Sequence, residues 1–375
     1  MRRLLMVGRT RYRLPLTPSL QRKFDALAER FDVRVLASGA GRGEAGDVMF
    51  DLARPIRPAA LDGLWFYARL PFRIATELRR TPTDVIAAQS PYEGLASLLG
   101  RRLAREAGGR PRVIVEIHGD WRTFARLYGS PLRKLVAPVA DRLARLAVRR
   151  ADAVRTLSPF TTELVRSQGV EPAGVFTTYT ELTAFSEPPL APLSDRPVAL
   201  VVGVLEPYKN IDGIAAAWRL AAARAPHALL RIVGDGRRRD IVESLVEDLP
   251  AQTEWVPRLE TPEVVQALDS AWLLVLPSRS EGTPRVVMEA LCRARAVIGG
   301  RAGGIPDVVE HEVTGVLVDP ERPQEIADAL VRLLGDQALC EKLGAAGHER
   351  AARWTYTPAE YASRMADLVE RVLAS

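Results

Sequence analysis

Short apolar runs alternate with longer amphipathic stretches along most of this 375-residue chain. The runs are rich in Val, Leu and Ile and show little polar alternation, which is typical of parallel strands that are buried on both faces. The longer stretches repeat their apolar residues at helical spacing. The pattern therefore predicts an α/β protein in which strands are joined by helices.

The expected elements form two groups. Strands of the first half are predicted at residues 4–7, 33–36, 85–88, 113–117 and 153–156, with helices such as 20–30 and 95–107 among them. Strands of the second half are predicted at residues 198–203, 229–233, 255–257, 273–277, 296–299 and 315–318, followed by helices at 323–334 and 358–374. Each group is sufficient for one doubly wound, Rossmann-like sheet.

A proline-rich segment at residues 187–197 interrupts both periodicities and is interpreted as a linker between two domains. A chain of this length exceeds one ordinary hydrophobic core, so two domains with a cleft between them are expected. We place an N-terminal domain at residues 1–190 and a C-terminal domain at residues 191–355. The last segment, residues 356–375, is expected to form a helix that packs back on the N-terminal domain.

The composition favours an ordinary globular protein of a reducing compartment. Hydrophobic residues make up 47% and charged residues 26% of the chain, so a disordered or fibrous class is excluded. The two cysteines, Cys292 and Cys340, form no pattern that would hold zinc. No apolar stretch approaches the roughly 20 residues of a membrane-spanning helix. A cytoplasmic location is therefore expected.

The charge is unevenly distributed along the chain. Residues 1–190 carry 31 Lys and Arg against 19 Asp and Glu, or +12, which leaves −6 for the rest of a chain whose net charge is +6. One interpretation of this asymmetry is an anionic partner of the N-terminal half, such as a lipid surface. The alternative is that the excess of arginine reflects only a GC-rich coding sequence.

Residues 122–150 contain eight basic residues and one acidic residue. Apolar residues at helical spacing lie on another face of this segment: Leu132, Leu135, Val136, Val139, Leu143 and Leu146. We favour the interpretation that this stripe is core; the alternative is an anionic membrane surface, with the protein peripheral on the inner face of the membrane. The aromatic and basic residues of segment 65–73 add weight to the alternative.

The segment 273–290 carries the most informative chemistry. A buried strand is followed by a polar loop containing Glu281, and a helix begins near Pro284. Ligands of open parallel sheets collect at the carboxyl ends of strands, where a helix N-terminus can bind a diphosphate. Glu281 and Glu289 would flank one pocket and accept hydrogen bonds from sugar and ribose hydroxyls. Lys209, after another strand, would supply a cation for the phosphates.

Four ordered blocks extend this pattern: 233–236 (VGDG), 280–284 (SEGTP), 303–307 (GGIPD) and 314–319 (TGVLVD). With two glutamates separated by seven residues, the chain resembles the retaining GT-B glycosyltransferases of family 4, the glycosyl transferases group 1. The match is good over residues 198–330. It implies a GT-B fold of two Rossmann-like domains with a nucleotide sugar bound mainly by the C-terminal one.

The resemblance also implies roles for individual residues. Glu281 would bind hydroxyls of the donor sugar, Glu289 the ribose, and Lys209 the diphosphate, with the base near Val256 and Pro257. The expected donor-binding set is Gly203, Lys209, Gly234, Val256, Glu281, Gly282, Thr283, Pro284, Arg285 and Glu289. Related enzymes have a histidine that contacts the donor sugar where this chain has His118. The catalytic set is therefore Lys209, Glu281 and His118, with His118 and Asp120 on the acceptor side.

This chain departs from the family pattern at several positions. Val204 stands where the family usually has an arginine, and Arg285 or Arg258 are the candidates to replace it. Asp307 stands where the family usually has a glutamate. Residues 8–16 lack the usual glycine-rich loop, so the resemblance does not identify the acceptor.

The resemblance predicts transfer of a sugar to a hydroxyl acceptor such as a sugar or glycolipid, in cell-envelope polysaccharide or glycolipid synthesis. No Asp-x-Asp motif is present, so neither a metal nor another cofactor is expected; the nucleotide sugar is a co-substrate. Alternatives are a sugar phosphorylase, a GT-B epimerase and a non-catalytic protein that binds sugar nucleotides. A dinucleotide-dependent oxidoreductase is disfavoured because the segment at Gly234 lacks the third glycine of the fingerprint. No nucleic-acid-binding module is recognised.

Overall fold

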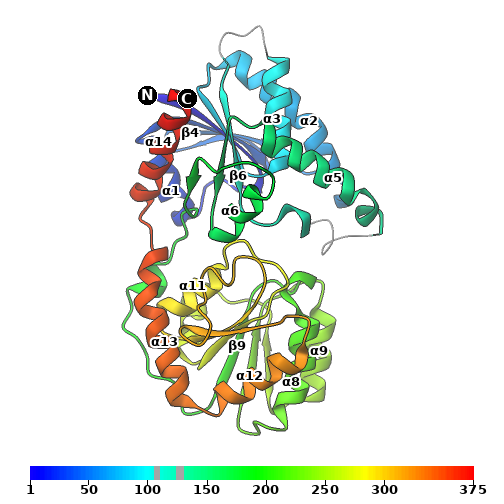
Figure 1. Cartoon of the computed structure of the whole chain (residues 1–375), viewed down its shortest axis with the longest axis vertical. Coiled ribbons are helices and arrows are strands. Elements are labelled where there is room, and N and C mark those ends of the chain that lie inside the picture. Colours follow the sequence, from blue (N-terminus) through cyan, green and yellow to red (C-terminus); the bar gives the residue numbers. More distant parts are fainter. Residues whose placement is uncertain (105–109, 124–130) are drawn as a thin grey trace. The chain divides into compact units, whose positions relative to one another are not determined.

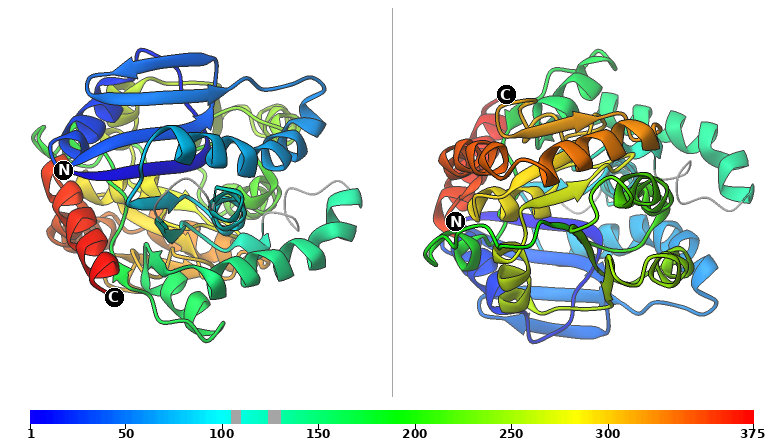
Figure 2. Two further views of the ribbon diagram at one scale, coloured as in Figure 1. Left: turned by 90° about the horizontal axis from the view of Figure 1, so that it is seen from above. Right: turned by 90° about the horizontal axis from the view of Figure 1, so that it is seen from below.

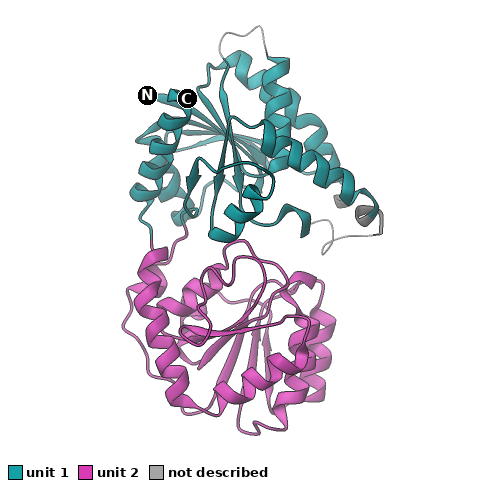
Figure 3. Cartoon of the chain, viewed as in Figure 1, with its two compact units in different colours: residues 1–179, 356–375 teal, residues 180–355 magenta. Residues whose placement is uncertain are grey.

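The computed structural model describes residues 1–104, 110–123 and 131–375. The chain forms two compact units, residues 1–179 with 356–375 and residues 180–355 (Figure 3). In each unit helices cover both faces of a largely parallel sheet (Figure 1). The predicted pair of Rossmann-like α/β domains is confirmed.

The described sheet of the first unit has the strand order β3-β4-β2-β1-β5-β6-β7-β8. Its strands are β1 (Arg2–Arg11), β2 (Phe31–Ser38), β3 (Gly41–Ala45), β4 (Val48–Ala53), β5 (Val85–Ala88), β6 (Arg112–Ile117), β7 (Ala153–Thr156) and β8 (Gly174–Val175). The pairs are parallel except for the hairpin of β3 and β4. The sequence pattern missed β3, β4 and β8.

Two groups of helices enclose this sheet (Figure 2). One face packs against α1 (Pro18–Ala28) and α14 (Pro358–Ala374). The other face packs against α2 (Ala59–Arg80), α3 (Pro91–Leu103), α5 (Pro131–Arg150) and α6 (Pro159–Arg166). The last helix of the chain contributes Tyr361, Met365 and Leu368 to the same core as Leu4 and Met6 of β1.

The described sheet of the second unit is parallel, with the order β11-β10-β9-β12-β13-β14. Its strands are β9 (Val198–Val202), β10 (Leu229–Val233), β11 (Thr253–Val256), β12 (Leu273–Leu276), β13 (Ala296–Gly300) and β14 (Gly315–Val318). Their side chains alternate between two apolar cores, one on each side of the sheet. This explains the continuous apolar runs in the sequence.

The helices of the second unit divide between the same two cores. One core includes α8 (Ile211–Ala222), α9 (Arg239–Asp248) and α12 (Pro323–Leu334). The other includes α7 (Thr183–Ser186), α10 (Thr261–Asp269) and α11 (Arg285–Cys292). Helix α13 (Gln337–Ala351) and the 3-10 turns η1 (Pro207–Lys209) and η2 (Ala352–Trp354) complete the described elements.

The boundary between the units lies after residue 179 rather than after residue 190. The proline-rich segment is attached to the second unit because buried arginines hold its carbonyl groups. Arg293 donates to the Pro188 and Pro189 oxygens at 2.7 Å each, and Arg295 to the Ala191 oxygen at 2.7 Å. The segment 187–197, which the sequence predicts to link the two domains, is therefore part of the second unit.

Helix α5 also differs from the favoured interpretation. Five residues of its apolar stripe, Leu135, Val136, Val139, Leu143 and Leu146, are exposed, with Leu135 at 76%. Small residues such as Ala144 and Ala147 face the protein instead. The core interpretation of this stripe is therefore wrong for these five; the side chain of Leu132 and all of residues 124–130 lie outside the described part of the chain. None of the described helices is long and apolar enough to span a bilayer.

Candidate active site

The strand order of the second unit brings two loops together. From β9 the chain adds β10 and β11 on one side, then returns to add β12, β13 and β14 on the other. The loops after β9 and β12 therefore leave neighbouring strands in opposite directions, which is the point where open α/β sheets bind ligands. Lys209 follows β9 and Glu281 follows β12.

Lys209 and Glu281 form an ion pair at this point. The Lys209 ammonium lies 2.6 Å from the Glu281 carboxylate, and the two side chains are only 13% and 11% exposed. Gly203, at the end of β9, has a φ of +153°, a backbone conformation that residues with a side chain rarely adopt. The pair that the sequence placed in one site is thus brought into direct contact.

Arg279 fixes the turn that carries Lys209. Its guanidinium donates to Asp212 at 3.0 and 2.9 Å, to the Pro207 oxygen at 3.1 Å and to Glu321 at 2.7 Å. Its backbone N–H donates to the Tyr208 oxygen at 2.8 Å. The hydrogen bonds to Asp212 hold the pKa of that carboxyl below its usual value. Arg279 lies two residues before Glu281, so it ties the Lys209 turn to the Glu281 loop.

Glu289 lies on α11, almost fully buried. Burial raises the pKa of its carboxyl, and the Arg285 guanidinium opposes that rise from 2.7 Å. Arg285 itself is exposed and also donates to the Glu181 oxygen at 3.5 Å. A buried carboxylate with one exposed partner can exchange that partner for ligand hydroxyls.

The loop around Glu281 is supported by the block at residues 303–307. Gly304 donates its N–H to the main-chain carbonyl oxygen of Glu281 at 3.0 Å. A Cβ on Gly304 would lie 1.8 Å from the Gly282 oxygen, so only glycine allows this approach. Thr283 and Pro284 then lead into α11, with Pro284 at the N-cap position.

Polar atoms near these loops lack partners. Asn210 Oδ1, Ser278 Oγ and Thr283 Oγ1 are buried and make no hydrogen bond within the described part of the chain. Asn210, in a left-handed conformation with φ of 61°, uses its amide nitrogen to hold the Pro277 and Pro320 oxygens. Buried polar atoms without partners are uncommon and indicate a site for water or ligand.

Other residues predicted for the donor site lie at the same edge of the sheet. Gly203 donates to the Val233 oxygen at 2.9 Å and Gly234 to the Val256 oxygen at 3.0 Å, so the ends of β9, β10 and β11 are joined in register. Trp255 donates its indole N–H to the Gly234 oxygen at 2.9 Å. These hydrogen bonds engage the main-chain oxygens of Gly234 and Val256, next to the position predicted for the base.

The structure describes the surroundings of Val204 and of the two arginines predicted to replace the family arginine, and that replacement stays a prediction. Val204 follows β9 and is 51% exposed. Arg285 is engaged by Glu289, and Arg258 pairs with Glu260 at 3.1 Å in an exposed position.

His118 and Asp120 belong to the first unit, directly after β6. His118 Nε2 lies 3.2 Å from a Glu116 oxygen. Asp120 accepts hydrogen bonds from the Arg122 backbone and guanidinium at 2.8–2.9 Å. Their places relative to the donor-site residues stay a prediction, as do the roles of all these residues.

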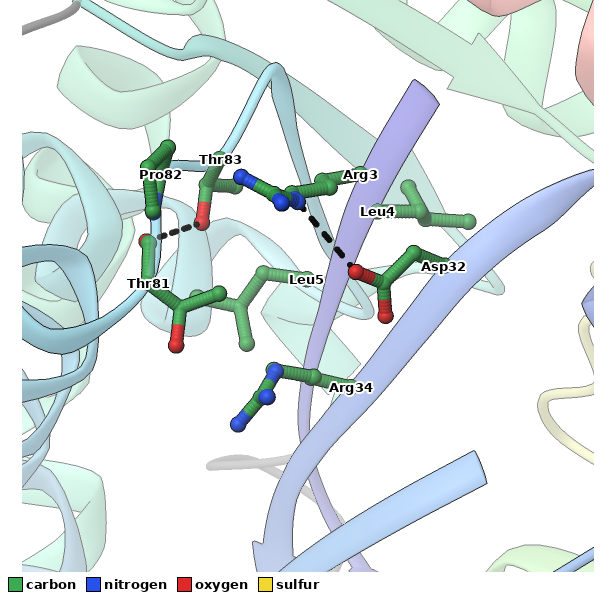
Figure 4. Close-up of a pocket in the computed structure, with 8 residues that line it drawn as sticks. All are labelled: Arg3, Leu4, Leu5, Asp32, Arg34, Thr81, Pro82 and Thr83. Carbon is green, nitrogen blue, oxygen red and sulfur yellow. Dashed lines mark hydrogen bonds and ion pairs between the residues drawn. The ribbon is translucent and has the colours of Figure 1, made fainter. Parts of the chain in front are cut away.

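One pocket of the first unit lies at the amino-terminal ends of β1 and β2 (Figure 4). It is lined by Arg3, Asp32 and the turn at residues 81–83, with Arg3 donating to Asp32 at 3.2 Å. It contains no predicted site residue. Within the described ranges, no group of three or more His, Cys, Asp or Glu side chains is arranged to hold a metal ion.

Two doubly wound units, one of them with a lysine–glutamate pair at its switch point, define a GT-B glycosyltransferase. A family model described as glycosyl transferases group 1 matches residues 185–350, and one described as a glycosyl transferase 4-like domain matches residues 17–179. The chain belongs to the group 1 glycosyltransferases.

Characterised relatives and solved structures agree with this assignment. The GDP-mannose-dependent monoacylated alpha-(1-6)-phosphatidylinositol monomannoside mannosyltransferase of Corynebacterium glutamicum is 27% identical over 81% of this chain and 76% of its own. The alpha-D-kanosaminyltransferase of Streptomyces kanamyceticus is 26% identical over 73% and 84%. Sucrose-phosphate synthase of Thermosynechococcus elongatus superposes with a TM-score of 0.79 at 18% identity, covering all of both chains. The HepE protein of Anabaena, solved with UDP, has a TM-score of 0.70 at 16% identity, covering 99% and 100%. At such identities these structures show the fold alone.

Proposed function

We propose that this glycosyltransferase moves a hexose from a nucleoside diphosphate sugar to a hydroxyl acceptor with retention of the anomeric configuration and without a metal ion. The observation that carries the proposal is the Lys209–Glu281 pair at the switch point, 2.6 Å long and nearly enclosed. A cation beside a carboxylate fits a sugar joined to a diphosphate, because the sugar hydroxyls need a hydrogen-bond acceptor and the diphosphate needs positive charge.

In this proposal Lys209 stabilises the charge that develops on the departing diphosphate, assisted by backbone N–H groups at the start of α11. Glu281 accepts hydrogen bonds from the sugar, and Glu289 from the ribose. The nearly buried Glu289 carboxyl and the orphaned oxygens of Asn210, Ser278 and Thr283 support a polar ligand at this edge. His118 contacts the sugar, and Asp120 lies on the acceptor side.

A thermal-shift screen against UDP, GDP and ADP and their sugar conjugates tests the donor. A ligand present at 100 times its Kd stabilises the protein by about 2.7 kcal/mol, which gives a clear shift in Tm. Nuclear magnetic resonance of the product then shows whether the anomeric configuration is retained, with and without EDTA. An inverted product or a chelator-sensitive rate contradicts the proposal, and sugar phosphate formed in the presence of phosphate favours a phosphorylase.

We also propose that the acceptor is presented at an anionic membrane surface, which the outer face of α5 contacts. Arg142, Arg145 and Arg149 are exposed along the same helix as the exposed apolar stripe. Its one acidic residue, Asp141, is buried. Exposed leucines flanked by arginines fit the interface of an anionic bilayer. The Corynebacterium relative is named for a phosphatidylinositol acceptor, which is consistent with a lipid-borne one.

Sedimentation with vesicles tests this surface. We expect binding to vesicles of phosphatidylcholine with phosphatidylglycerol and little binding to phosphatidylcholine alone. Leu135→Glu with Leu143→Glu should weaken binding by at least tenfold, because each buried leucine contributes about 1.5–3 kcal/mol. Leu220→Glu on α8, at an exposed leucine of the other unit, is the matched control. Equal binding by all three proteins contradicts the proposal.

A further inference from the structure

A buried polar network lies behind His118 in the first unit. Glu116 on β6 and Arg155 on β7 are cross-strand partners in the sheet register. The Arg155 guanidinium donates to Glu116 Oε1 at 2.5 Å, and both side chains are almost completely buried. The second Glu116 oxygen faces His118 Nε2 at 3.2 Å. The carboxylate thus joins an enclosed arginine to a histidine whose side chain is 39% exposed.

Several further contacts hold Arg155 in place. It donates to the Phe176 and Thr177 oxygens at 3.1 and 3.0 Å. Its guanidinium also stacks on the Phe176 ring at 4.0 Å and lies 5.5 Å from the Tyr361 ring of α14. An arginine held by this many contacts cannot turn away from Glu116, so the position of the carboxylate is determined by the fold.

The charges around Glu116 keep it an acceptor. Burial alone would raise the pKa of its carboxyl, but the charge of Arg155 and the hydrogen bond of His118 lower that pKa to about 2. Lys23 of α1, which lies 5.1 Å from the Tyr361 ring, adds to the lowering. Tyr361 on α14 is a further titratable group of this cluster, with its ring 5.5 Å from the Arg155 guanidinium. At neutral pH Glu116 is therefore a carboxylate, which accepts hydrogen bonds and donates none.

We infer that Glu116 and Arg155 are positioning residues that hold the proton of the neutral His118 ring on Nε2, so that Nδ1 presents a lone pair to a hydroxyl of the bound sugar. The inference rests on the proposed function, since it deepens the role given there to His118. A ring nitrogen is a donor or an acceptor according to the proton on the other nitrogen, and the partner of one fixes the role of both. His118 would then recognise a hydroxyl by accepting a hydrogen bond.

Glu116→Gln is the sharpest test, because it keeps the shape of the side chain and reverses one hydrogen bond. Arg155 can only donate, so it holds the amide oxygen of the new side chain, and the amide nitrogen then faces His118. His118 Nε2 must become the acceptor, and the ring proton moves to Nδ1. The tautomer is measured from ring nitrogen shifts of the ¹⁵N-histidine-labelled full chain at about pH 8.5, above the usual histidine pKa of about 6.5. The His118 signals are identified by their loss in His118→Gln.

We expect the Nε2–H tautomer in the wild type and the Nδ1–H tautomer in Glu116→Gln. With the donor from the thermal-shift screen, kcat/KM should fall at least tenfold in Glu116→Gln. The double variant Glu116→Gln with His118→Ala should be no slower than His118→Ala alone, because a positioning residue has no effect once its target is removed. The same tautomer in both proteins, unchanged kcat/KM in Glu116→Gln, or additive losses would overturn the inference.

Two further measurements separate the possible failures. If Glu116→Gln does not fold, the pair Glu116→Leu with Arg155→Met removes both buried charges together, which cores often tolerate. We expect this pair to reproduce the loss seen in His118→Ala, and full activity would refute the inference. The tautomer is read without any donor, so a protein that transfers no sugar but shows the predicted change disproves the proposed function, whereas control of the His118 proton by Glu116 and Arg155 is supported independently of it.

Discussion

Removing the Lys209 ammonium should affect stability and turnover by different amounts. Lys209→Met keeps most of the apolar stem but leaves Glu281, only 11% exposed, without its partner at 2.6 Å. Breaking one side of a buried ion pair costs about 3–5 kcal/mol, and this pair is slightly open to solvent, so we expect about 3 kcal/mol of lost stability. Adding Glu281→Gln should restore most of this loss.

The loss of turnover should remain when the stability is restored. If Lys209 meets the charge on the departing diphosphate, its removal costs about 2.7–4 kcal/mol of transition-state stabilisation, or a factor of about 10²–10³ in kcat. The measurement is release of the nucleoside diphosphate at saturating donor, with unfolding followed separately by circular dichroism. Lys342→Met, at an exposed lysine of α13, is the matched control.

One result would refute this reasoning. If kcat of Lys209→Met stays within about threefold of the wild type, or about 0.65 kcal/mol, the ammonium does not stabilise the leaving group. A large rise in KM with unchanged kcat would instead show that Lys209 binds the donor equally in the ground state and the transition state.

Three further predictions concern the neighbourhood of the site. Gly304→Ala should lower kcat/KM by about 100-fold, because the added Cβ would lie 1.8 Å from a carbonyl oxygen and must displace the Glu281 loop. Gly335→Ala is the control: its added Cβ would lie 3.1 Å from the nearest atom, and its kcat/KM should stay close to that of the wild type. Arg279→Lys should lower kcat/KM about tenfold, since an ammonium cannot replace a guanidinium that binds both Asp212 oxygens; a wild-type value would show that the turn needs no such anchor. The folded-state pKa of Glu116 lies below its usual 4.5, so the ionised carboxylate stabilises the fold above pH 4.5 and this stabilisation is lost as the pH falls towards 2. In urea unfolding the free energy of unfolding should therefore fall by about 3 kcal/mol over this pH range, and Glu116→Gln should lack this decrease. The same pH dependence in both proteins would contradict the prediction.

Much of the fold could be predicted because the central strands are buried on both faces. Such strands appear as unbroken apolar runs, and the strand 315–318 was predicted with the observed bounds. The hairpin of β3 and β4 was missed because Arg42 and Glu44 of β3 are exposed on an edge strand, where no apolar run is required. The attachment of the linker was missed because it depends on Arg293, about 100 residues away in the sequence.

Helix α5 shows another limit of periodicity. Its spacing predicts an amphipathic helix, and an apolar stripe is usually the buried one. Here Ala144, Ala147 and Val148 face the protein, while Leu143 and Leu146 are exposed. Small side chains let this helix pack closely on α3, its neighbour in the structure. Which of two apolar faces is covered depends on that neighbour and is absent from the local pattern.

The residues of the candidate site also differ in how far the sequence reveals them. Glu281, Glu289 and Lys209 could be found because each follows a strand whose position the sequence reveals, and because their spacing resembles a known family. Arg279 and Arg155 carry no comparable signal, since an arginine in a loop or strand is equally common on the surface of a basic chain. Only the coordinates show that Arg155 is enclosed and that Arg279 clamps a turn.

The last helix of the chain has a consequence for biosynthesis. The second unit is one continuous stretch, residues 180–355, whereas the core of the first unit needs Tyr361, Met365 and Leu368 from beyond it. During translation one face of the sheet in residues 1–179 is therefore incompletely covered until residues 356–375 have been synthesised. If a ribosome stalled or a protease cut near residue 355, the product would have a complete second unit. Its first unit would lack the last helix.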